Sequence, residues 1–203
     1  MRTGGWIWRH WEPIPALVSA PCTHACCAVR GSLVVFGVST HDHEYASSVE
    51  MSSEGGEFVE LPPLSCGGIL CAVAIAVKES DSAAGQVLLL GGGTHIGEEL
   101  STVQLVALAT GVCTPQPALL HGRMSFAAAG LPDGRIICVG GFGGSGPLST
   151  TEMWGPPVQG AVTAAWTWRA LPAMSVGLVG CSGCMMSDGR FAVLKEHVKH
   201  RHR

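Results

Sequence analysis

Short apolar stretches separated by glycine, proline and polar turns recur along the chain. The clearest are four runs at residues 31–37, 85–92, 134–141 and 189–194, each a glycine followed within two residues by four or five mostly apolar residues. Apolar runs of this length bounded by turn residues predict buried β-strands. The leading glycines lie 54, 49 and 55 residues apart. The strands therefore indicate an internal repeat of about fifty residues.

A second strand is predicted at a nearly constant distance after each of the first three runs. Its centre is marked by Glu50, Gln104 and Glu152, which lie 19, 19 and 18 residues after the leading glycines. So constant an offset indicates that one structural unit is repeated rather than that similar strands occur by chance.

Two further elements complete each repeat. An aromatic or apolar anchor followed by a proline-bearing turn begins at residues 11, 58, 113 and 168. Strands rich in Ala, Cys, Ser and Gly precede the leading glycines, at residues 25–29, 71–77, 126–129 and 181–186. Each repeat thus predicts four short strands, of which the small-residue strand suits a crowded position.

Composition supports an all-β fold and excludes several partners. Of 203 residues, 28 are Gly and 12 are Pro, while 47% are hydrophobic, which favours short strands and turns around a core. The chain has 12 basic and 15 acidic residues and a net charge of -3. It therefore lacks the excess of positive charge that favours binding to nucleic acid or anionic lipid. No apolar run approaches the roughly 18 residues of a membrane-spanning helix.

The N-terminal residues and the number and spacing of the cysteines indicate the cellular compartment of the protein. The first residues lack the apolar stretch of a secretory signal. Nine cysteines, an odd number without framework spacing, indicate reduced buried thiols. We therefore expect an intracellular, cytoplasmic protein.

Taken together, these motifs resemble kelch repeats over about residues 11–194: an apolar strand ending in Gly-Gly, a strand at fixed offset, a Trp before a proline turn, and Asp-Gly-Arg turns at 133–135 and 188–190. The resemblance implies four-stranded blades of a β-propeller, with Trp11, Phe58 and Trp168 packed between blades. The chain departs from the family pattern in having a single tyrosine, Tyr45, and in replacing the last Gly-Gly with Lys195 and Glu196.

The domain organisation predicted from the repeats is a kelch-type partial arc. It comprises a lead at 1–10, approximate repeats at 11–57, 58–112, 113–167 and 168–194, and a divergent basic tail at 195–203. Closed propellers have about 4 to 8 blades. We therefore expect an incomplete arc whose open blade edges favour self-association, since two arcs could close one ring. The tail is interpreted as the product of an exon or frame boundary rather than as a functional basic segment.

Polar loop residues are the candidate contacts for a partner. His41, Asp42, His43 and Glu44 follow the second strand of one repeat, and His95 lies in the corresponding loop of the next. Arg123 lies in the loop between the proline-bearing strand and the small-residue strand of the repeat at 113–167. In kelch-like proteins these loops share a face that commonly binds partner peptides, which the resemblance implies for these residues. The alternative is that they are solvated loop residues.

No metal, cofactor or catalytic residue is predicted. The cysteine groups at Cys22, His24, Cys26 and Cys27, and at Cys181 and Cys184, superficially resemble zinc ligands. In an extended strand, residues three apart point to opposite faces, which favours buried thiols over zinc. Galactose oxidase also uses kelch-type blades, but resemblance to it would imply several tyrosine ligands for copper, and this chain has one tyrosine. No Gly-x-Ser-x-Gly motif is present.

The expected function is a non-catalytic protein–protein interaction module, an adaptor or scaffold with a protein partner of unknown identity. Two alternatives stay open. The repeats could be the substrate-binding part of a larger ligase adaptor or enzyme, or an incomplete chain with no independent function.

Overall fold

The described part of the chain consists of β-strands and their connections. The computed structural model describes residues 24–37, 47–52, 56–77, 84–94, 96–144, 146–156 and 165–195, and none of these residues is helical. The predicted all-β class is confirmed for this part. Consequently, no helix in these ranges has the length and hydropathy needed to cross a membrane.

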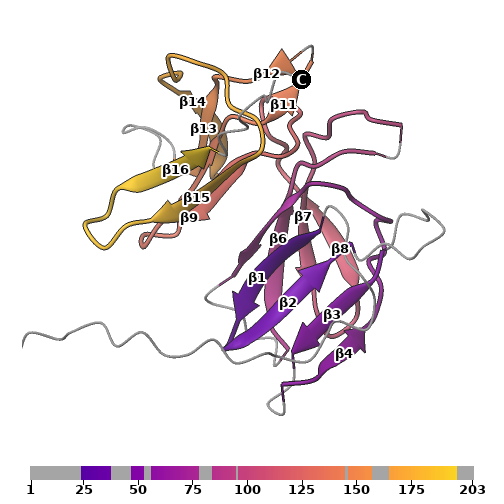
Figure 1. The fold of residues 1–203 in the computed structure, drawn as a ribbon. Coiled ribbons are helices and arrows are strands. Elements are labelled where there is room, and N and C mark those ends of the chain that lie inside the picture. The colour runs from indigo at the N-terminus through magenta and orange to yellow at the C-terminus, as the bar shows by residue number, and fades with distance from the viewer. Residues whose placement is uncertain are drawn as a thin grey trace, which may run out of the picture.

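The strands form three four-stranded antiparallel sheets and two smaller ones (Figure 1). The first sheet comprises β1 (Ala25–Val29), β2 (Ser32–Phe36), β3 (Val49–Ser52) and β4 (Phe58–Leu61). The second comprises β5 (Val73–Ala76), β6 (Gln86–Leu90), β7 (Val103–Ala107) and β8 (Val112–Gln116). The third comprises β9 (Ala127–Gly130), β10 (Ile136–Val139), β13 (Thr151–Gly155) and β14 (Thr167–Leu171). Strands β11 (Phe142–Gly143) and β12 (Gly146–Pro147) form a hairpin, and β15 (Cys181–Met185) pairs with β16 (Phe191–Lys195).

The order and register of the three full sheets agree with the repeat. Each sheet is built in chain order, with every strand paired to the strand that precedes it in the same sheet. The polar residues at constant offset occupy equivalent places, because Glu50 lies opposite Val35, Gln104 opposite Leu89 and Glu152 opposite Cys138. Four-stranded antiparallel sheets of this kind are compatible with the blades of a β-propeller.

The sheets do not begin where the predicted repeats begin. The anchors at 58, 113 and 168 lie in β4, β8 and β14, which are the fourth strands of their sheets. The aromatic and proline motif therefore closes one sheet before the linker to the next. The predicted lead at 1–10 and residues 196–203 of the predicted tail lie outside the described residues.

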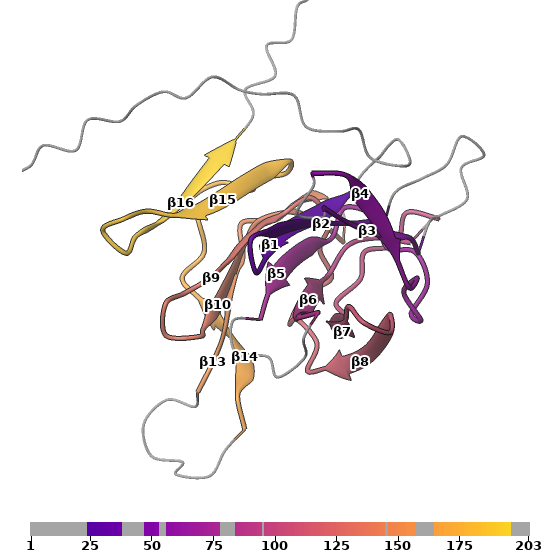
Figure 2. The same ribbon diagram turned by 90° about the horizontal axis from the view of Figure 1, so that it is seen from below.

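The first strands of successive sheets lie side by side, β1 with β5, β5 with β9 and β9 with β15 (Figure 2). Their small residues suit this crowding, as the sequence predicts. At Gly183 in β15, an added Cβ would lie 2.3 Å from the ring of Phe191 and 3.1 Å from the Cβ of Ala127. A larger side chain at that position would push β15 away from β9.

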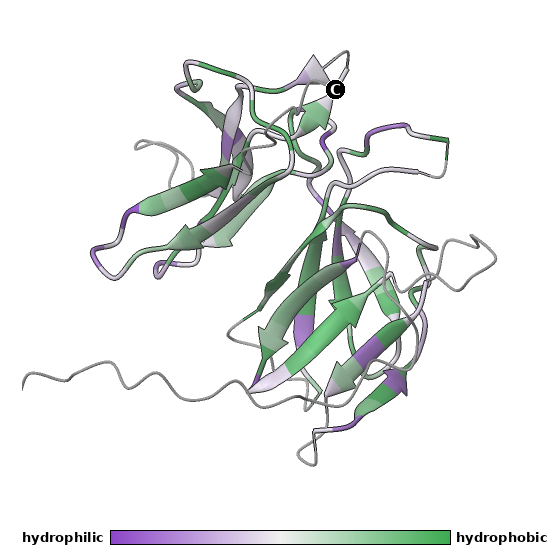
Figure 3. Cartoon of the chain, in the orientation of Figure 1, coloured by the Kyte–Doolittle hydropathy of each residue, from purple (hydrophilic) through white to green (hydrophobic). Residues whose placement is uncertain are grey.

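Apolar side chains fill the junctions between the sheets. Val34, Phe36 and Val49 of the first sheet pack with Val87, Leu89 and Val106 of the second. The other face of the second sheet contributes Leu90 and Val103 to a cluster with Ile136, Cys138 and Trp168 of the third. Figure 3 shows the hydrophobic colouring along these strands. Because successive strand residues point to opposite faces, the unbroken apolar run in β6 covers both neighbours.

Trp168 confirms the prediction that this residue packs between sheets. Its side chain is buried in the cluster at the junction of the second and third sheets. The indole Nε1 donates a hydrogen bond of 2.9 Å to the carbonyl oxygen of Pro117, which follows β8. This bond satisfies the buried N–H and joins the third sheet to the end of the second.

The Gly-Gly pairs of the second and third sheets tie each of these sheets to the linker that follows it. Gly92 and Gly141 have φ values of +99° and +100°. The Gly92 N–H donates to the carbonyl oxygen of Arg123 at 2.8 Å, and the Gly141 N–H donates to that of Leu178 at 2.7 Å. A residue with a Cβ atom cannot adopt this backbone conformation without strain, so glycine is required at both places.

We expect Gly141→Ala to destabilise the fold. The added Cβ would lie 2.7 Å from the Cβ of Phe126 and 2.8 Å from the oxygen of Met124. Strain at this φ adds to the clash, so the free energy of unfolding should fall by at least about 2 kcal/mol. Urea denaturation measures the change.

Gly146→Ala is the matched control, because its Cβ would meet nothing within 4 Å and its φ lies outside the positive region. This variant should unfold at about the same urea concentration as the parent. Equal losses in the two variants would contradict the role assigned to Gly141.

Candidate functional site

The loops between second and third strands and the linkers between sheets lie at one end of the molecule. This follows from the antiparallel order, since both kinds of connection start where a strand runs to the same end. We call this end the loop face; its described residues are 37, 47–48, 62–72, 91–94, 96–102, 117–126, 140–144, 146–150 and 172–180. It is the upper end of the molecule in Figure 1.

Large apolar side chains are exposed on the loop face. Ile96 is 68% exposed, Val176 59%, Leu120 49% and Val179 39%. They come from a loop of the second sheet and from the linkers before and after the third. Apolar side chains gathered on connecting loops are typical of surfaces that bind another protein.

Backbone hydrogen bonds hold these loops together. The N–H groups of Leu119 and Arg123 donate to the carbonyl oxygens of Ser101 and Leu100 at 2.8 and 3.1 Å. The N–H of Leu178 donates to the oxygen of Leu148 at 3.0 Å. The exposed side chains therefore project from loops whose backbone is already ordered, which lowers the entropic cost of binding.

A buried ion pair lies beneath the loop face. The Arg123 guanidinium donates from Nη2 to Glu152 Oε1, and neither side chain is exposed to solvent. The guanidinium also donates from Nη1 to the carbonyl oxygen of Gly140 at 2.7 Å and from Nη2 to Thr150 Oγ1 at 3.0 Å. These partners compensate much of the cost of burying the charge.

The carboxylate of Glu152 also holds the linker. It accepts hydrogen bonds from the backbone N–H of Leu120 at 2.7 Å and from that of His121 at 3.0 Å. The half-exposed ring of His121 places Nδ1 3.0 Å from Glu152 Oε1. Glu152 on β13 thus fixes the segment that presents Leu120.

The interpretation of Arg123 as a partner contact is wrong. The side chain is fully buried and bound inside the third sheet. Its linker folds back over β13, and this tertiary arrangement cannot be recognised from an arginine in a predicted loop. His41, Asp42, His43, Glu44 and His95, the other candidate contacts, lie outside the described residues.

The second sheet has no arginine in the equivalent place. The backbone bridges of Leu70 with Gly93 and of Met124 with Phe142 occupy matching positions, and they align Ile69 with Arg123. The polar residue aligned with Glu152 is Gln104, whose buried Oε1 has no hydrogen-bond partner among the described residues. The buried ion pair of arginine and glutamate is therefore a feature of the third sheet rather than of every repeat.

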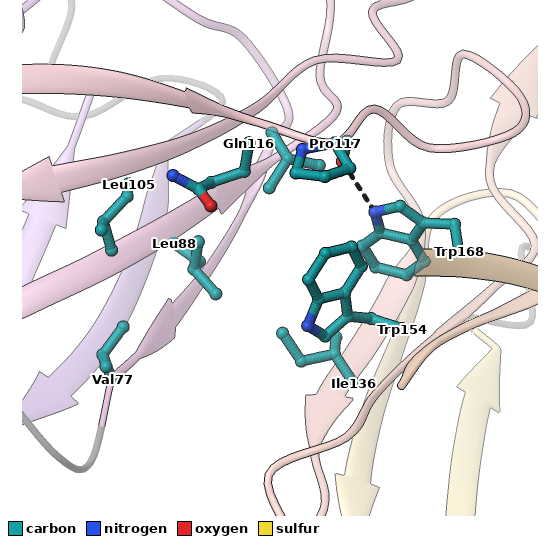
Figure 4. Close-up of a pocket in the computed structure, with 9 residues that line it drawn as sticks. Val77, Leu88, Leu105, Gln116, Pro117, Ile136, Trp154 and Trp168 are labelled. Atoms are coloured by element: carbon teal, nitrogen blue, oxygen red, sulfur yellow. Dashed lines mark hydrogen bonds between the residues drawn. The ribbon is translucent and has the colours of Figure 1, made fainter. Parts of the chain in front are cut away.

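An apolar cavity opens between the second and third sheets. It has a volume of about 180 Å³, and Figure 4 shows Trp154 and Trp168 facing Leu88 and Leu105 across it. The two indole rings are 5.8 Å apart between centroids and tilted by 49°. A neighbouring cavity of about 490 Å³ reaches the turn between β9 and β10. Such walls suit apolar groups.

The cysteines differ from one another in burial. Cys181 is buried and Cys184 exposed, which confirms that the two point to opposite faces of β15. The expectation of buried thiols is wrong for Cys26 and Cys66 as well as Cys184, because all three are exposed. Burial raises the pKa of the Cys138 thiol.

Two cysteine groups of the sequence superficially resemble zinc ligands. Cys22 lies outside the described residues. Within the ranges that the structure describes, no three or more His, Cys, Asp or Glu side chains are placed to hold a metal ion.

Comparison of the chain with known protein families finds no match, and comparison with curated proteins finds none either.

We expect Glu152→Gln to destabilise the protein by about 3–5 kcal/mol, because the Arg123 guanidinium stays buried without its counter-charge. Urea denaturation measures the loss. Tryptophan fluorescence, with Trp154 and Trp168 in the third sheet, should report the same transition.

Asp188→Asn is the control. It removes an ion pair with Arg190 in which both side chains are well exposed, so the urea midpoint should hardly change. If Glu152→Gln is as stable as this control, the buried pair does not hold the linker.

Proposed function

We propose that this chain is a kelch-type β-propeller arc that acts as a non-catalytic protein–protein interaction module, an adaptor or scaffold. The observation that carries the proposal is the group of exposed apolar side chains on the hydrogen-bonded loops of the loop face. The four-stranded sheets and their constant register support the kelch-type architecture.

The partner surface should itself be apolar at its centre. Ile96 and Leu120 would enter contact with it, and exposure of 68% and 49% leaves both side chains free to do so. Glu98 is exposed beside Ile96, and a basic group on the partner would complement it. Apolar anchors with a charged rim are the usual composition of such interfaces.

An alternative is that the loop face holds the substrate of a larger ligase adaptor or enzyme. The same side chains would then contact a protein that is subsequently modified. To separate this role from scaffolding, the captured partner is assayed for covalent modification in the presence of the assembled complex.

The test substitutes the apolar side chains of the loop face. We expect Ile96→Gln and Leu120→Gln each to weaken partner binding by about tenfold, because buried apolar anchors dominate interface energetics. Quantitative mass spectrometry of cross-linked complexes, followed by affinity measurement with the purified partner, gives the readout.

Met186→Gln is the matched control. Met186 is 46% exposed, close to the 49% of Leu120, but it lies in the turn between β15 and β16, at the end opposite to the loop face. Partners lost with the control as well as with the loop-face variants would contradict the proposal. Thermal melts establish that all three variants are folded.

A second proposal concerns self-association through the fourth sheet. Among the described residues β16 pairs with β15 alone, and Leu194 on β16 is 62% exposed. An edge strand with an exposed apolar residue can pair with another chain.

We expect light scattering to give about twice the chain mass of 21.0 kDa, with a cooperative thermal transition. Leu194→Lys should restore the monomer, since a charged edge residue opposes strand pairing. A parent protein that is monomeric across the concentration range would overturn this second proposal and leave the loop face unaffected.

A further inference from the structure

The segment that follows β4 lies against the start of β8. The Ser65 N–H donates to the carbonyl oxygen of Gly111 at 3.0 Å, and the Cys113 N–H donates to Ser65 Oγ at 2.9 Å. The two backbones approach so closely that a Cβ on Gly111 would lie 2.1 Å from the oxygen of Pro63. The linker between the first two sheets is thereby held beside the outer strand of the second.

This arrangement brings two thiols together. Cys66 follows Ser65 in the linker. Cys113 lies in β8, and its N–H is bonded to Ser65 Oγ, so the two thiols lie close to each other. Both are free thiols; Cys66 is exposed and Cys113 partly buried. An oxidant in solution can therefore reach Cys66, and the second thiol already lies beside it.

We propose that Cys66 and Cys113 form an intramolecular disulfide when the protein meets a disulfide oxidant of the glutathione class. The Cys66 thiolate attacks one sulfur of glutathione disulfide, forming a mixed disulfide and releasing one glutathione. The Cys113 thiolate then attacks the Cys66 sulfur and releases the second. The two thiol protons pass to the two glutathione thiolates, so one protein dithiol is oxidised as one glutathione disulfide is reduced.

Thiol chemistry makes this oxidation slow at neutral pH. Burial and, next, the neighbouring Cys113 thiol raise the pKa of Cys66 to about 12. The attacking thiolate is therefore scarce at neutral pH and increases about tenfold for each pH unit below the pKa. The disulfide should form over hours at neutral pH and faster in alkaline buffer.

The bond would enclose the second sheet. Cys66 and Cys113 are 47 residues apart, and β5, β6 and β7 lie between them. A cross-link over a long segment restricts the unfolded chain more than the folded one. The oxidised protein should consequently melt about 5–10 °C higher than the reduced protein.

The experiment treats the purified full chain with glutathione disulfide at pH 7 and pH 9. Alkylation and peptide mass spectrometry without reduction identify the cross-link, and a thermal melt gives its effect. We expect a peptide pair joined through Cys66 and Cys113, faster formation at pH 9, and reversal of the melting shift by a reductant.

Single variants assign the bond. Cys66→Ser and Cys113→Ser should each abolish the oxidation-dependent shift, whereas Cys184→Ser, which removes another exposed thiol, should retain it. Stable glutathionylation of Cys66 without ring closure, or a disulfide to any other cysteine, would overturn the proposal. Because the cross-link is mapped in the parent protein, the result does not depend on how well a variant folds.

Discussion

Each full sheet carries apolar side chains on the faces that meet its neighbours, and this constraint governs the rest of the structure. The second sheet shows it most clearly, because Val87 and Leu89 pack against the first sheet while Leu90 packs against the third. A single sheet of this kind would leave an apolar face in water. Burying one Val or Leu side chain contributes roughly 1.5–3 kcal/mol. The sheets therefore stabilise one another in series rather than folding as separate units.

Close packing of the sheets sets requirements on the inner strands and on the loop face. Small residues let β1, β5, β9 and β15 lie next to one another. Above them, the Gly-Gly turns donate hydrogen bonds to the following linkers. The third sheet adds the buried pair of Arg123 and Glu152, which orders the linker that carries Leu120. Buried polar groups thus order the linker, while apolar side chains such as Leu120 stay exposed on it.

The junction of the first two sheets is held differently from that of the second and third. No arginine occupies the position aligned with Arg123, since Ile69 stands there. Instead, Ser65 bonds to Gly111 and Cys113, and a pair of thiols lies beside these bonds. The two junctions therefore respond to different conditions, one governed by a buried ion pair and the other by the redox state of its cysteines.

Local sequence patterns predict the strands of the three full sheets and their order along the chain. Periodic glycines and apolar runs predicted the strands, and the constant offset of Glu50, Gln104 and Glu152 predicted their equivalent places in the three sheets. These are local patterns, repeated at nearly constant intervals along the chain. The aromatic anchors marked real strands but left their sheet membership open, because pairing between strands depends on the fold.

The burial and the contacts of the polar and sulfur-bearing side chains depend on the tertiary structure. Arg123 has the sequence context of an exposed loop residue, yet the linker folds over β13 and buries its guanidinium on Glu152. Cys113 begins a predicted anchor while Cys66 lies between predicted strands, and the two approach each other only because the linker lies against β8. The exposure of Ile96 and Leu120 likewise depends on which loops cover their neighbours. Burial and charge pairing arise from contacts between residues distant in the chain, and local sequence patterns do not encode those contacts.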